Sequence, residues 1–517
     1  MSGVVRVILA GLWMAVSIAA QAGAQGDVSG VYEGVARTAS HGDVPVSLEL
    51  RVEQGRIGGV MHTPLGDFFI SRGSLEGERL TLTLDSYDDE ATLTASLSGG
   101  LLKSEFVGFG ERARLELKRT GPVGPIIRPR IKLSKDEWRE DLRYLARELP
   151  LKHKNAFHRI TRAQFEREVS ALDARLPSLS DDRIVMEMSR IVAMIGDGHT
   201  SLGWGSLFPR VPLGLFWFGG ELRVTETTVR ERRLLGAKVL KIGGVPIAEV
   251  YRREQPYIQQ AETEGFVRNW SARYLLYPAH LKTLGLSREA THAAYTFEDE
   301  RGSRFTLNIR AAESADDAQW LDAARSKPLS AMRAERPLWY EYLKDSQTLY
   351  FNFAGYPRRR EFEAFSREFF DFIDSHDVKR LVIDMRRNGG GDFNRGREFI
   401  VGKLKQRPRF GERGRLYVIT GRATFSAGMV NALDFRNELH AILVGEPTGQ
   451  RPNSYSENRG FSLPNSHLDL SYSTEFYKLQ PTDTPGVIPD QLIEPDWSSY
   501  RAGRDRALEW ILAGQSR

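Results

Sequence analysis

A short apolar strand runs directly into a glycine-rich turn at Leu381-Val382-Ile383-Asp384-Met385-Arg386-Arg387-Asn388-Gly389-Gly390-Gly391. Strand and helix patterns alternate around it, with further continuous apolar strands at 349–353, 416–420 and 441–444. Strands without a polar face are typical of a parallel sheet that helices cover on both sides. Residues 313–517 are therefore predicted to form an α/β domain.

Two strand ends in this domain carry unusual residues. In open α/β sheets, functional sites lie beyond the carboxyl ends of the strands. The glycines at 389–391 allow the backbone to approach a ligand and to point amides at it, although a flexible turn also explains them. The second end, 420–429, places Ser426 at a helix N-terminus. Free amides and the helix dipole there favour a developing anion, as acyl transfer requires; a helix-capping serine is the alternative.

The N-terminus carries a secretory signal pattern. Arg6 precedes an apolar run at 7–20, and Ala-x-Ala sites follow at 20–24. This pattern predicts a cleavable export signal at 1–24, with an uncleaved anchor as the alternative. The run is short for a membrane span. The mature protein is expected to be exported to a bacterial periplasm or secreted, without stable membrane insertion.

Composition excludes several classes of protein. The 517 residues exceed one domain, and 41% apolar with 27% charged residues is typical of folded proteins. The absence of cysteine removes disulfide scaffolds, thiolate metal sites and cysteine nucleophiles. The 72 basic and 67 acidic residues are interleaved, which is no footprint of nucleic-acid binding. No metal, cofactor or nucleic-acid partner is predicted, and the oligomeric state stays open.

Three regions separate the signal from the α/β domain. Residues 25–120 alternate with period two, which predicts an all-β accessory domain, either a sandwich or a barrel. A Gly/Pro-rich linker then opens a helical segment at 121–205, where capping boxes at Ser134 and Thr161 begin amphipathic helices. That segment ends at Gly196-Asp197-Gly198-His199-Thr200. Residues 206–312 are strand-rich again.

Four motifs together resemble the S41 serine peptidases, the superfamily of tail-specific (C-terminal processing) and tricorn-like proteases. The motifs are Gly196-Asp197-Gly198-His199-Thr200, 384–391, Phe425-Ser426-Ala427-Gly428 and Gly486-Val487-Ile488-Pro489-Asp490. The stretch 236–247 is similar to a strand pair of PDZ-like domains. The resemblance begins near residue 133 and implies a multidomain α/β protein, with a PDZ-like β domain at 206–312 and a ClpP/crotonase-like S41 catalytic domain at 313–517.

The resemblance also implies roles for single residues. Ser426 is the expected nucleophile, and amides of Gly389 or Gly390, together with Ala427, are the expected oxyanion hole. Tail-specific members use a lysine as the base. Arg451 stands at that position here, and a guanidinium cannot accept the serine proton.

The tricorn-like branch uses a histidine, whose position His199 matches; a neutral imidazole suits the task of a general base. The group that orients His199 is less well defined. The tricorn-like pattern has a serine before the histidine, where this chain has Gly198. Asp483 matches the place of the carboxylate, with Asp197 and Glu446 as alternatives.

The sequence therefore predicts an exported serine peptidase that cleaves peptide bonds through an acyl-enzyme on Ser426. An α/β-hydrolase elbow is absent because Thr424 stands where its first glycine belongs. Leu213, Gly214 and Leu215 are a candidate PDZ-like loop for a peptide terminus, with an ordinary strand start as the alternative. The alternative function is a non-proteolytic ligand- or peptide-binding protein on the same scaffold.

Overall fold

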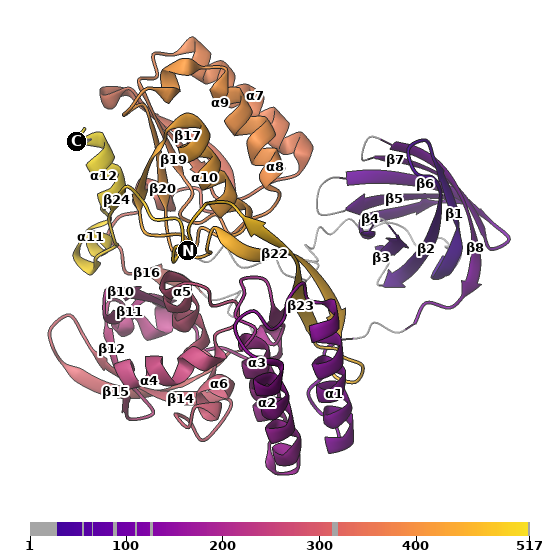
Figure 1. Ribbon diagram of the computed structural model, residues 1–517, viewed down its shortest axis with the longest axis horizontal. Helices are drawn as coiled ribbons and strands as arrows, with labels where there is room; N and C mark the ends of the chain where they lie inside the picture. The colour runs from indigo at the N-terminus through magenta and orange to yellow at the C-terminus, as the bar shows by residue number, and fades with distance from the viewer. Residues whose placement is uncertain are drawn as a thin grey trace. The chain divides into compact units, whose positions relative to one another are not determined.

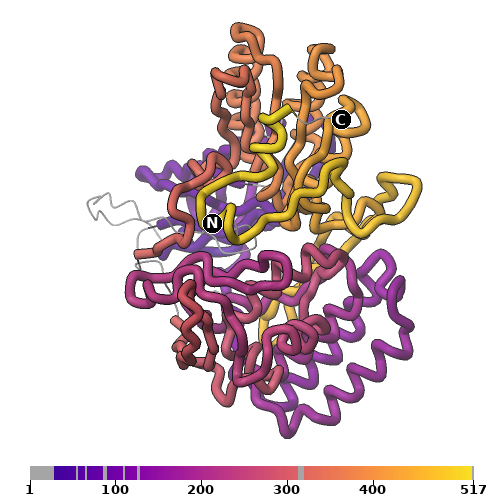
Figure 2. The backbone as a smooth tube through the Cα atoms, turned by 90° about the vertical axis from the view of Figure 1, so that its left-hand side faces the viewer, coloured from indigo at the N-terminus to yellow at the C-terminus, as the bar shows by residue number. Residues whose placement is uncertain are grey.

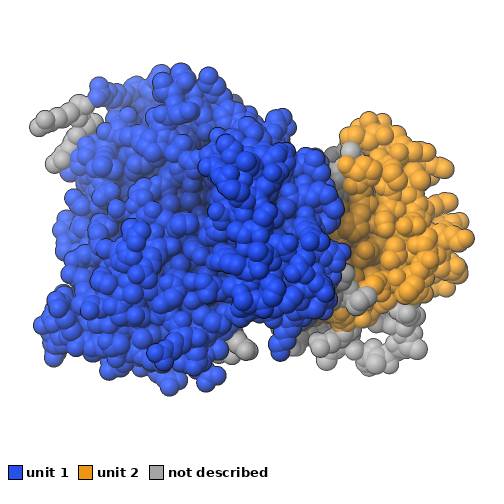
Figure 3. Space-filling view, turned by 60° about the horizontal axis from the view of Figure 1, so that its bottom comes forward, with its two compact units in different colours: residues 1, 127–356, 369–517 blue, residues 2–126, 357–368 orange. Residues whose placement is uncertain are grey.

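The computed structural model describes residues 28–53, 56–64, 66–85, 90–108, 111–124, 128–312 and 319–514. The predicted signal at 1–24 lies outside these residues. The chain divides into two compact units, one of residues 127–356 with 369–517 and one of residues 2–126 with 357–368 (Figure 3). Within the described ranges, no helix combines the length and the apolar character that crossing a bilayer requires.

The smaller unit contains a closed β-barrel, which confirms the all-β prediction for the N-terminal region and selects a barrel over a sandwich (Figure 1). Consecutive strands pair antiparallel, and β1 closes the ring against β8. Side chains alternate between interior and solvent, so large residues such as Leu48, Leu82 and Leu115 fill the barrel. Its strands are β1 Gly30–Thr38, β2 Gly42–Glu53, β3 Arg56–Thr63, β4 Gly66–Glu76, β5 Arg79–Asp85, β6 Glu90–Ser98, β7 Leu101–Gly108 and β8 Glu111–Gly121.

The larger unit begins with the predicted amphipathic helices, α1 Lys135–Lys152, α2 Arg162–Arg175 and α3 Asp181–Ala193. Both capping boxes form. At α1, the Ser134 hydroxyl accepts from the Glu137 amide at 3.2 Å, and the Glu137 carboxylate accepts from the Ser134 amide at 2.7 Å. Soon after α3, Gly196 adopts a φ of +75°, which turns the chain sharply towards His199.

A second sheet follows in the order β10-β11-β12-β14-β15, with β13 beside β12 and β16 beside β11. The predicted strand, Gly-Gly turn and strand at 236–247 is confirmed as β12 and β13. The strands are β10 Leu213–Phe218, β11 Glu221–Thr228, β12 Lys238–Ile242, β13 Val245–Pro246, β14 His292–Glu298, β15 Arg304–Arg310 and β16 Trp320–Asp322. The accompanying helices are α4 Ile247–Glu254, α5 Glu264–Tyr274 and α6 Pro278–Thr283.

The predicted α/β domain contains a sheet in the order β17-β18-β19-β20-β21-β24, in which only the edge pair β17–β18 is antiparallel among the described strands. Helices cover both faces: α12 packs on one side, and Phe369 of α7 contacts Phe351 on the other. The strands are β17 Leu338–Leu343, β18 Thr348–Phe353, β19 Arg380–Asp384, β20 Leu416–Thr420, β21 Ile442–Gly445 and β24 Gln491–Leu492. The helices are α7 Arg359–Ser375, α8 Phe393–Gly396, α9 Gly402–Lys405, α10 Ala427–Leu439, α11 Trp497–Ala502 and α12 Arg506–Leu512.

A small third sheet joins the helical segment to the C-terminal part of the chain. Its order is β22-β23-β9, where β9 is only Ser201–Leu202, and β22 and β23 are Asn453–Ser462 and Asp469–Lys478. Leu202 pairs with Leu470 across more than 260 residues of intervening chain. Figure 2 shows the purple trace of the helices below and the orange trace of the parallel sheet above. The β9–β23 pairing thus brings the chain next to His199 to the C-terminal part.

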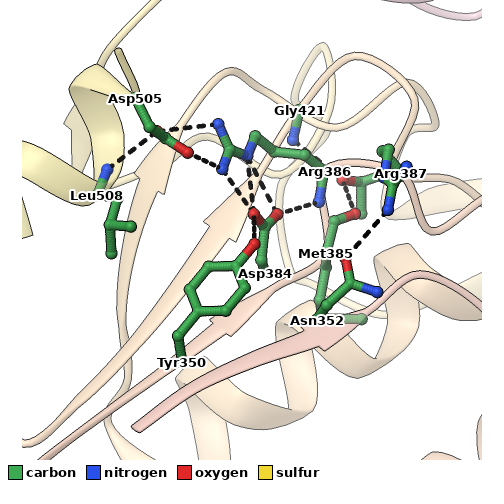
Figure 4. A network of polar contacts seen from close by, with 10 residues as sticks. Tyr350, Asn352, Asp384, Met385, Arg386, Arg387, Gly421, Asp505 and Leu508 are labelled. Atoms are coloured by element: carbon green, nitrogen blue, oxygen red, sulfur yellow. Dashed lines mark hydrogen bonds and ion pairs between the residues drawn. The ribbon is translucent and has the colours of Figure 1, made fainter. Parts of the chain in front are cut away.

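A buried ion-pair network holds the base of the glycine-rich turn (Figure 4). Arg386 lies between Asp384, at the end of β19, and Asp505, with nitrogen–oxygen distances of 2.6 and 3.1 Å. The Tyr350 hydroxyl also donates to Asp384, at 2.6 Å. Asp505 in turn accepts from the Leu508 amide at 3.1 Å and so caps α12. One guanidinium therefore fixes both the turn after β19 and the last described helix.

We expect Arg386→Ala to lower the free energy of unfolding of the larger unit by about 3 kcal/mol or more, because it leaves two buried carboxylates without their cation. Urea denaturation followed by tryptophan fluorescence measures the change. Arg504→Ala is the matched control, since Arg504 pairs with Glu509 at an exposed site and should cause no measurable change. Equal effects of the two substitutions would contradict the structural role of Arg386.

Candidate active site

The two predicted strand ends meet. Parallel strands β19 and β20 end side by side, so the loops that follow them pack together. The Thr424 hydroxyl donates to the Met385 carbonyl at 2.8 Å, and the Phe425 amide donates to the Asn388 carbonyl at 2.9 Å. Thr424, the residue that excludes an α/β-hydrolase elbow, is therefore the anchor between the loops. The glycine-rich turn and Ser426 form one site.

Ser426 has a strained backbone. It stands directly before α10 with φ +51° and ψ −126°, a conformation that residues with a side chain rarely adopt and that costs about 1–3 kcal/mol. The fully buried Gln450 helps to hold it there, because its Oε1 accepts from the Ser426 amide at 2.7 Å. The serine hydroxyl is thereby held between two loops and projects from a fixed turn.

Two glycines make this turn possible. At Gly390, a Cβ would lie 2.7 Å from the Cβ of Ser426, and its φ is +112°. At Gly428, on the first turn of α10, a Cβ would lie 2.6 Å from the Asn388 carbonyl oxygen. Larger residues at either position would push the serine loop and the glycine-rich turn apart.

His199 reaches the serine from the other end of the chain. Its Nε2 lies 3.1 Å from Ser426 Oγ, and its Nδ1 lies 3.3 Å from the backbone carbonyl oxygen of Tyr455. A carbonyl can only accept, so this contact favours the tautomer with its hydrogen on Nδ1, in which Nε2 presents its lone pair to the serine hydroxyl. The Gln450 Nε2, also a donor, lies farther from Nδ1, at 3.5 Å, and donates to the Ser454 and Ser456 hydroxyls. The favoured tautomer is the one that a general base requires.

Hydrogen bonds fix both the carbonyl and the amide of His199. The Ser471 hydroxyl, on β23, donates to the His199 carbonyl at 2.8 Å. The Asp197 carboxylate accepts from the His199 amide at 2.8 Å. The β9–β23 pairing and the preceding aspartate together set the position of the imidazole.

Burial lowers the pKa of His199 below its ordinary value of 6.5, because the surroundings disfavour the charged imidazolium. The negative charge of Asp197 and the Tyr455 carbonyl act in the opposite direction but do not outweigh burial. His199 is therefore neutral, and able to accept a proton, at and above neutral pH.

The structure does not bring Asp483 to the histidine. Asp483 is exposed, and its carboxylate accepts from the side-chain amide of Asn453 at 2.7 Å. Glu446 pairs with the guanidinium of Arg422, at 2.9 Å from Nε. Over the described residues, the hydrogen-bond acceptor at His199 Nδ1 is the Tyr455 carbonyl, which no sequence pattern identifies.

Asp197 is close to His199 but serves a different pair. Its carboxylate lies 2.8 Å from Nε2 of His153 and accepts from the Ser473 hydroxyl at 2.6 Å. Burial raises the pKa of Asp197, but its hydrogen bonds with His153 and Ser473 outweigh burial and lower the pKa to about 2. Asp197 thus remains an anion beneath the histidine loop and influences His199 through space.

The predicted oxyanion-hole amides differ in availability. The Gly390 amide donates to the Asn388 side chain at 3.0 Å, an internal turn bond that engages it. Gly389 is exposed, and Ala427 is the first residue of α10. Among the described residues, no acceptor takes the amide hydrogen of Gly389 or Ala427. Of the three predicted amides, these two are therefore not engaged by another group of the described chain.

The remaining motifs support the loop that carries Gln450. The Val487 amide donates to the Thr448 hydroxyl at 2.8 Å, and Asp490 accepts from the Leu443 amide at 2.8 Å. Arg451 contacts Glu262 and not the serine: its Nε donates to the Glu262 carbonyl at 3.0 Å. Over the described residues, no group of His, Asp and Glu side chains is arranged to hold a metal ion.

The candidate peptide-binding residues form a strand. Leu213 and Leu215 lie on β10 and belong to, or pack against, the core of the second sheet. Gly214 pairs with Glu226 on β11. The backbone shows that these residues are the ordinary start of strand β10. A role for them in peptide binding stays a prediction.

We expect Gln450→Glu to raise the pKa of His199. The Gln450 Nε2 lies 3.5 Å from His199 Nδ1, so a carboxylate there stabilises the imidazolium. The midpoint of the loss of Ser426 reactivity towards a fluorophosphonate that protonation of His199 causes should move up by roughly one unit. The labelling rate, measured by mass spectrometry across pH 5–9, tests this.

Gln450→Leu is the matched control. It removes the acceptor of the Ser426 amide without adding charge, so the labelling rate should fall about tenfold or more at every pH. The pH midpoint that His199 governs should not move. An unchanged midpoint in Gln450→Glu would show that the side chain does not act on His199.

Comparisons with known proteins give distant matches in structure only. No protein-family model matches the chain, and no curated protein matches its sequence. Mature CPAF complexed with lactacystin has a TM-score of 0.48 and 10% identity, over 73% of this chain and 97% of that one. The photosystem II D1 C-terminal processing protease has a TM-score of 0.34 and 14% identity, over 72% and 99%.

The tricorn protease has a TM-score of 0.33 and 14% identity, over 91% of this chain and 43% of that one. Each of these TM-scores lies below 0.5, so the likeness does not identify the chemistry of the site, which depends on the geometry of Ser426 and His199.

Proposed function

We propose that this protein is a serine peptidase of the S41 type, with Ser426 as the nucleophile and His199 as the general base. The observation that carries the proposal is the 3.1 Å contact between His199 Nε2 and Ser426 Oγ, made by residues 227 positions apart. A structural serine at a helix start needs neither a strained φ nor a histidine with its lone pair towards the hydroxyl.

The first half of the reaction forms an acyl-enzyme. Ser426 Oγ attacks the scissile carbonyl carbon while His199 Nε2 takes the hydroxyl proton. The C–N bond then breaks, and His199 returns the proton to the leaving amine. In the second half, His199 takes a proton from water and the hydroxide attacks the ester carbonyl carbon. The bond from that carbon to Ser426 Oγ then breaks, His199 returns the proton to Ser426 Oγ, and the carboxylic acid product leaves.

Two sets of groups stabilise the charges that develop, one for the imidazolium and one for the oxyanion. The imidazolium donates from Nδ1 to the Tyr455 carbonyl and lies near the Asp197 carboxylate. The negative charge on the carbonyl oxygen develops next to the amides of Gly389 and Ala427, at the positive end of the α10 dipole. Asp483, by contrast, bonds to Asn453 in the described part of the chain and has no role at His199 in this proposal.

We also propose the substrates, the location and the domain types of the enzyme. Substrates are peptides or polypeptides, export follows from the signal pattern at 1–24, and no cofactor is required. The second sheet is proposed to be a PDZ-like domain, and the parallel sheet a ClpP/crotonase-like catalytic domain. The supporting observations are the motif order in the sequence and the strand–turn–strand of β12 and β13.

We expect a fluorophosphonate probe to label wild-type protein at Ser426 and to leave Ser426→Ala unlabelled. His199→Ala should reduce the labelling rate by about 10³-fold or more, because the hydroxyl loses its proton acceptor. Peptide mapping by mass spectrometry locates the adduct. His440→Ala is the matched control, since His440 follows α10 outside the site and its loss should not change the rate.

Peptide hydrolysis by the same set of variants extends the test from reactivity to turnover. A mixed peptide library should be cleaved by wild type and by His440→Ala, but not by Ser426→Ala. Labelling without any cleavage would point to the alternative function, a binding protein that retains a reactive serine. Absence of labelling in folded wild-type protein would refute the proposal.

A further inference from the structure

Glu262 is a buried carboxylate that the proposed mechanism does not use. It lies just before α5, and only 7% of its surface is exposed. Its Oε1 accepts from the Gly198 amide at 2.7 Å, and its Oε2 accepts from the Arg451 amide at 3.0 Å. Gly198 directly precedes His199, and Arg451 directly follows Gln450. One carboxylate therefore joins the loop of the base to the loop that supports the nucleophile.

The junction around Glu262 is tightly packed. A Cβ at Gly198 would lie 3.2 Å from Glu262 Oε1 and 2.9 Å from the ring of Phe425. Phe425 precedes Ser426, and its ring packs against His199 at a centroid distance of 5.2 Å. The neighbouring Thr263 donates to the Gly449 carbonyl at 2.9 Å while capping α5. A shift of Glu262 is thus transmitted to both sides of the Ser426–His199 pair.

The contact with Glu262 explains why a residue without a side chain occupies position 198. The tricorn-like pattern places a serine before the histidine, whereas Gly198 leaves room for Glu262 to accept directly from the backbone. The carboxylate binds the peptide unit next to His199 and does not contact the imidazole. It can therefore set the position of the base without sharing its proton.

Over the described ranges, three charged groups face Glu262. Asp197, from the loop after α3, repels its charge, and Arg451, from the loop after β21, attracts it. Arg159, from the loop between α1 and α2, donates to the Gly196 and Ala261 carbonyls and interacts with the same carboxylate. Burial is the largest influence and raises the pKa of Glu262 to about 7, against the two amide hydrogen bonds and Arg451.

We propose that Glu262 is a positioning residue whose ionised carboxylate ties the His199 loop to the Gln450 loop, and that its protonation loosens the Ser426–His199 pair. The inference rests on the proposed function. An ionised carboxylate accepts from both amides at once. A protonated one points a hydroxyl at one of them, and that hydrogen bond is lost. The rate should therefore rise through neutral pH with the ionisation of Glu262.

Glu262→Gln tests the proposal because its amide mimics the protonated acid: it accepts at the oxygen and presents hydrogens to the second backbone amide. At pH 8 its fluorophosphonate labelling rate should be about tenfold below wild type, since small displacements of catalytic groups are costly. The rise in rate near pH 7 should disappear, and the loss at lower pH that protonation of His199 causes should remain. Glu264→Gln, an exposed carboxylate two residues away, should keep the wild-type profile.

Hydrogen exchange supplies a readout that does not depend on activity. After correction for intrinsic rates, peptides that contain Gly198 and Arg451 should exchange faster at pH 6 than at pH 8 in wild type. They should exchange fast at both pH values in Glu262→Gln. If Glu262→Gln does not fold, the pH dependence in wild type alone decides, and its absence overturns the inference.

The two proposals fail differently. Wild-type protein that never labels refutes the peptidase, and the positioning role falls with it. Wild-type labelling with an identical pH profile in Glu262→Gln overturns only the role of Glu262. A tenfold loss without any change in the pH profile also overturns it, because a purely structural defect lowers the rate equally at every pH.

Discussion

The arrangement of the site depends on the backbone pairing of β9 with β23. Two residues, Ser201 and Leu202, pair with Ser471 and Leu470 and so tie the end of the helical segment to the C-terminal hairpin. Without this pairing, nothing in the local structure of 196–200 would place His199 within reach of a serine that follows it by more than 200 residues. The hairpin also supplies the Tyr455 carbonyl, so the same sheet positions the base and orients its ring.

A second constraint acts on the nucleophile. The positive φ of Ser426 is tolerated because several independent contacts fix the turn: Thr424 to the Met385 carbonyl, Phe425 to the Asn388 carbonyl, and the Ser426 amide to Gln450. The Arg386 network holds the glycine-rich turn from below. Strain of this kind persists only where the surroundings determine it, and such positions cluster at functional sites.

The sequence predicts much of this architecture where a pattern is local. Capping boxes, period-two strands and the continuous apolar strand at 381–383 each determine nearby structure, and they are confirmed at Ser134, Thr161, the barrel and β19. Motifs also identify Ser426 and His199 as the candidate nucleophile and base. The barrel could not be distinguished from a sandwich, because closure depends on the pairing of β1 with β8 and not on any one strand.

The supporting residues are harder to find from sequence for physical reasons. Gln450 and Glu262 act through hydrogen bonds to backbone amides of distant loops, and neither their spacing nor their residue type marks such a role. Asp483 illustrates the converse. Its position relative to Gly486 matches a family pattern, but in the folded chain its side chain points to Asn453 on an exposed turn. The group that does lie next to the His199 ring, the Tyr455 carbonyl, is brought there by the β22–β23 hairpin.

The use of a backbone carbonyl to orient His199 has an evolutionary consequence. A carboxylate partner is visible in any alignment and is lost by a single codon change. The carbonyl of Tyr455 belongs to every residue that could occupy that position, so substitutions there preserve the acceptor as long as the strand keeps its path. A substitution at residue 455 can therefore change the contacts of the side chain and still leave His199 its acceptor.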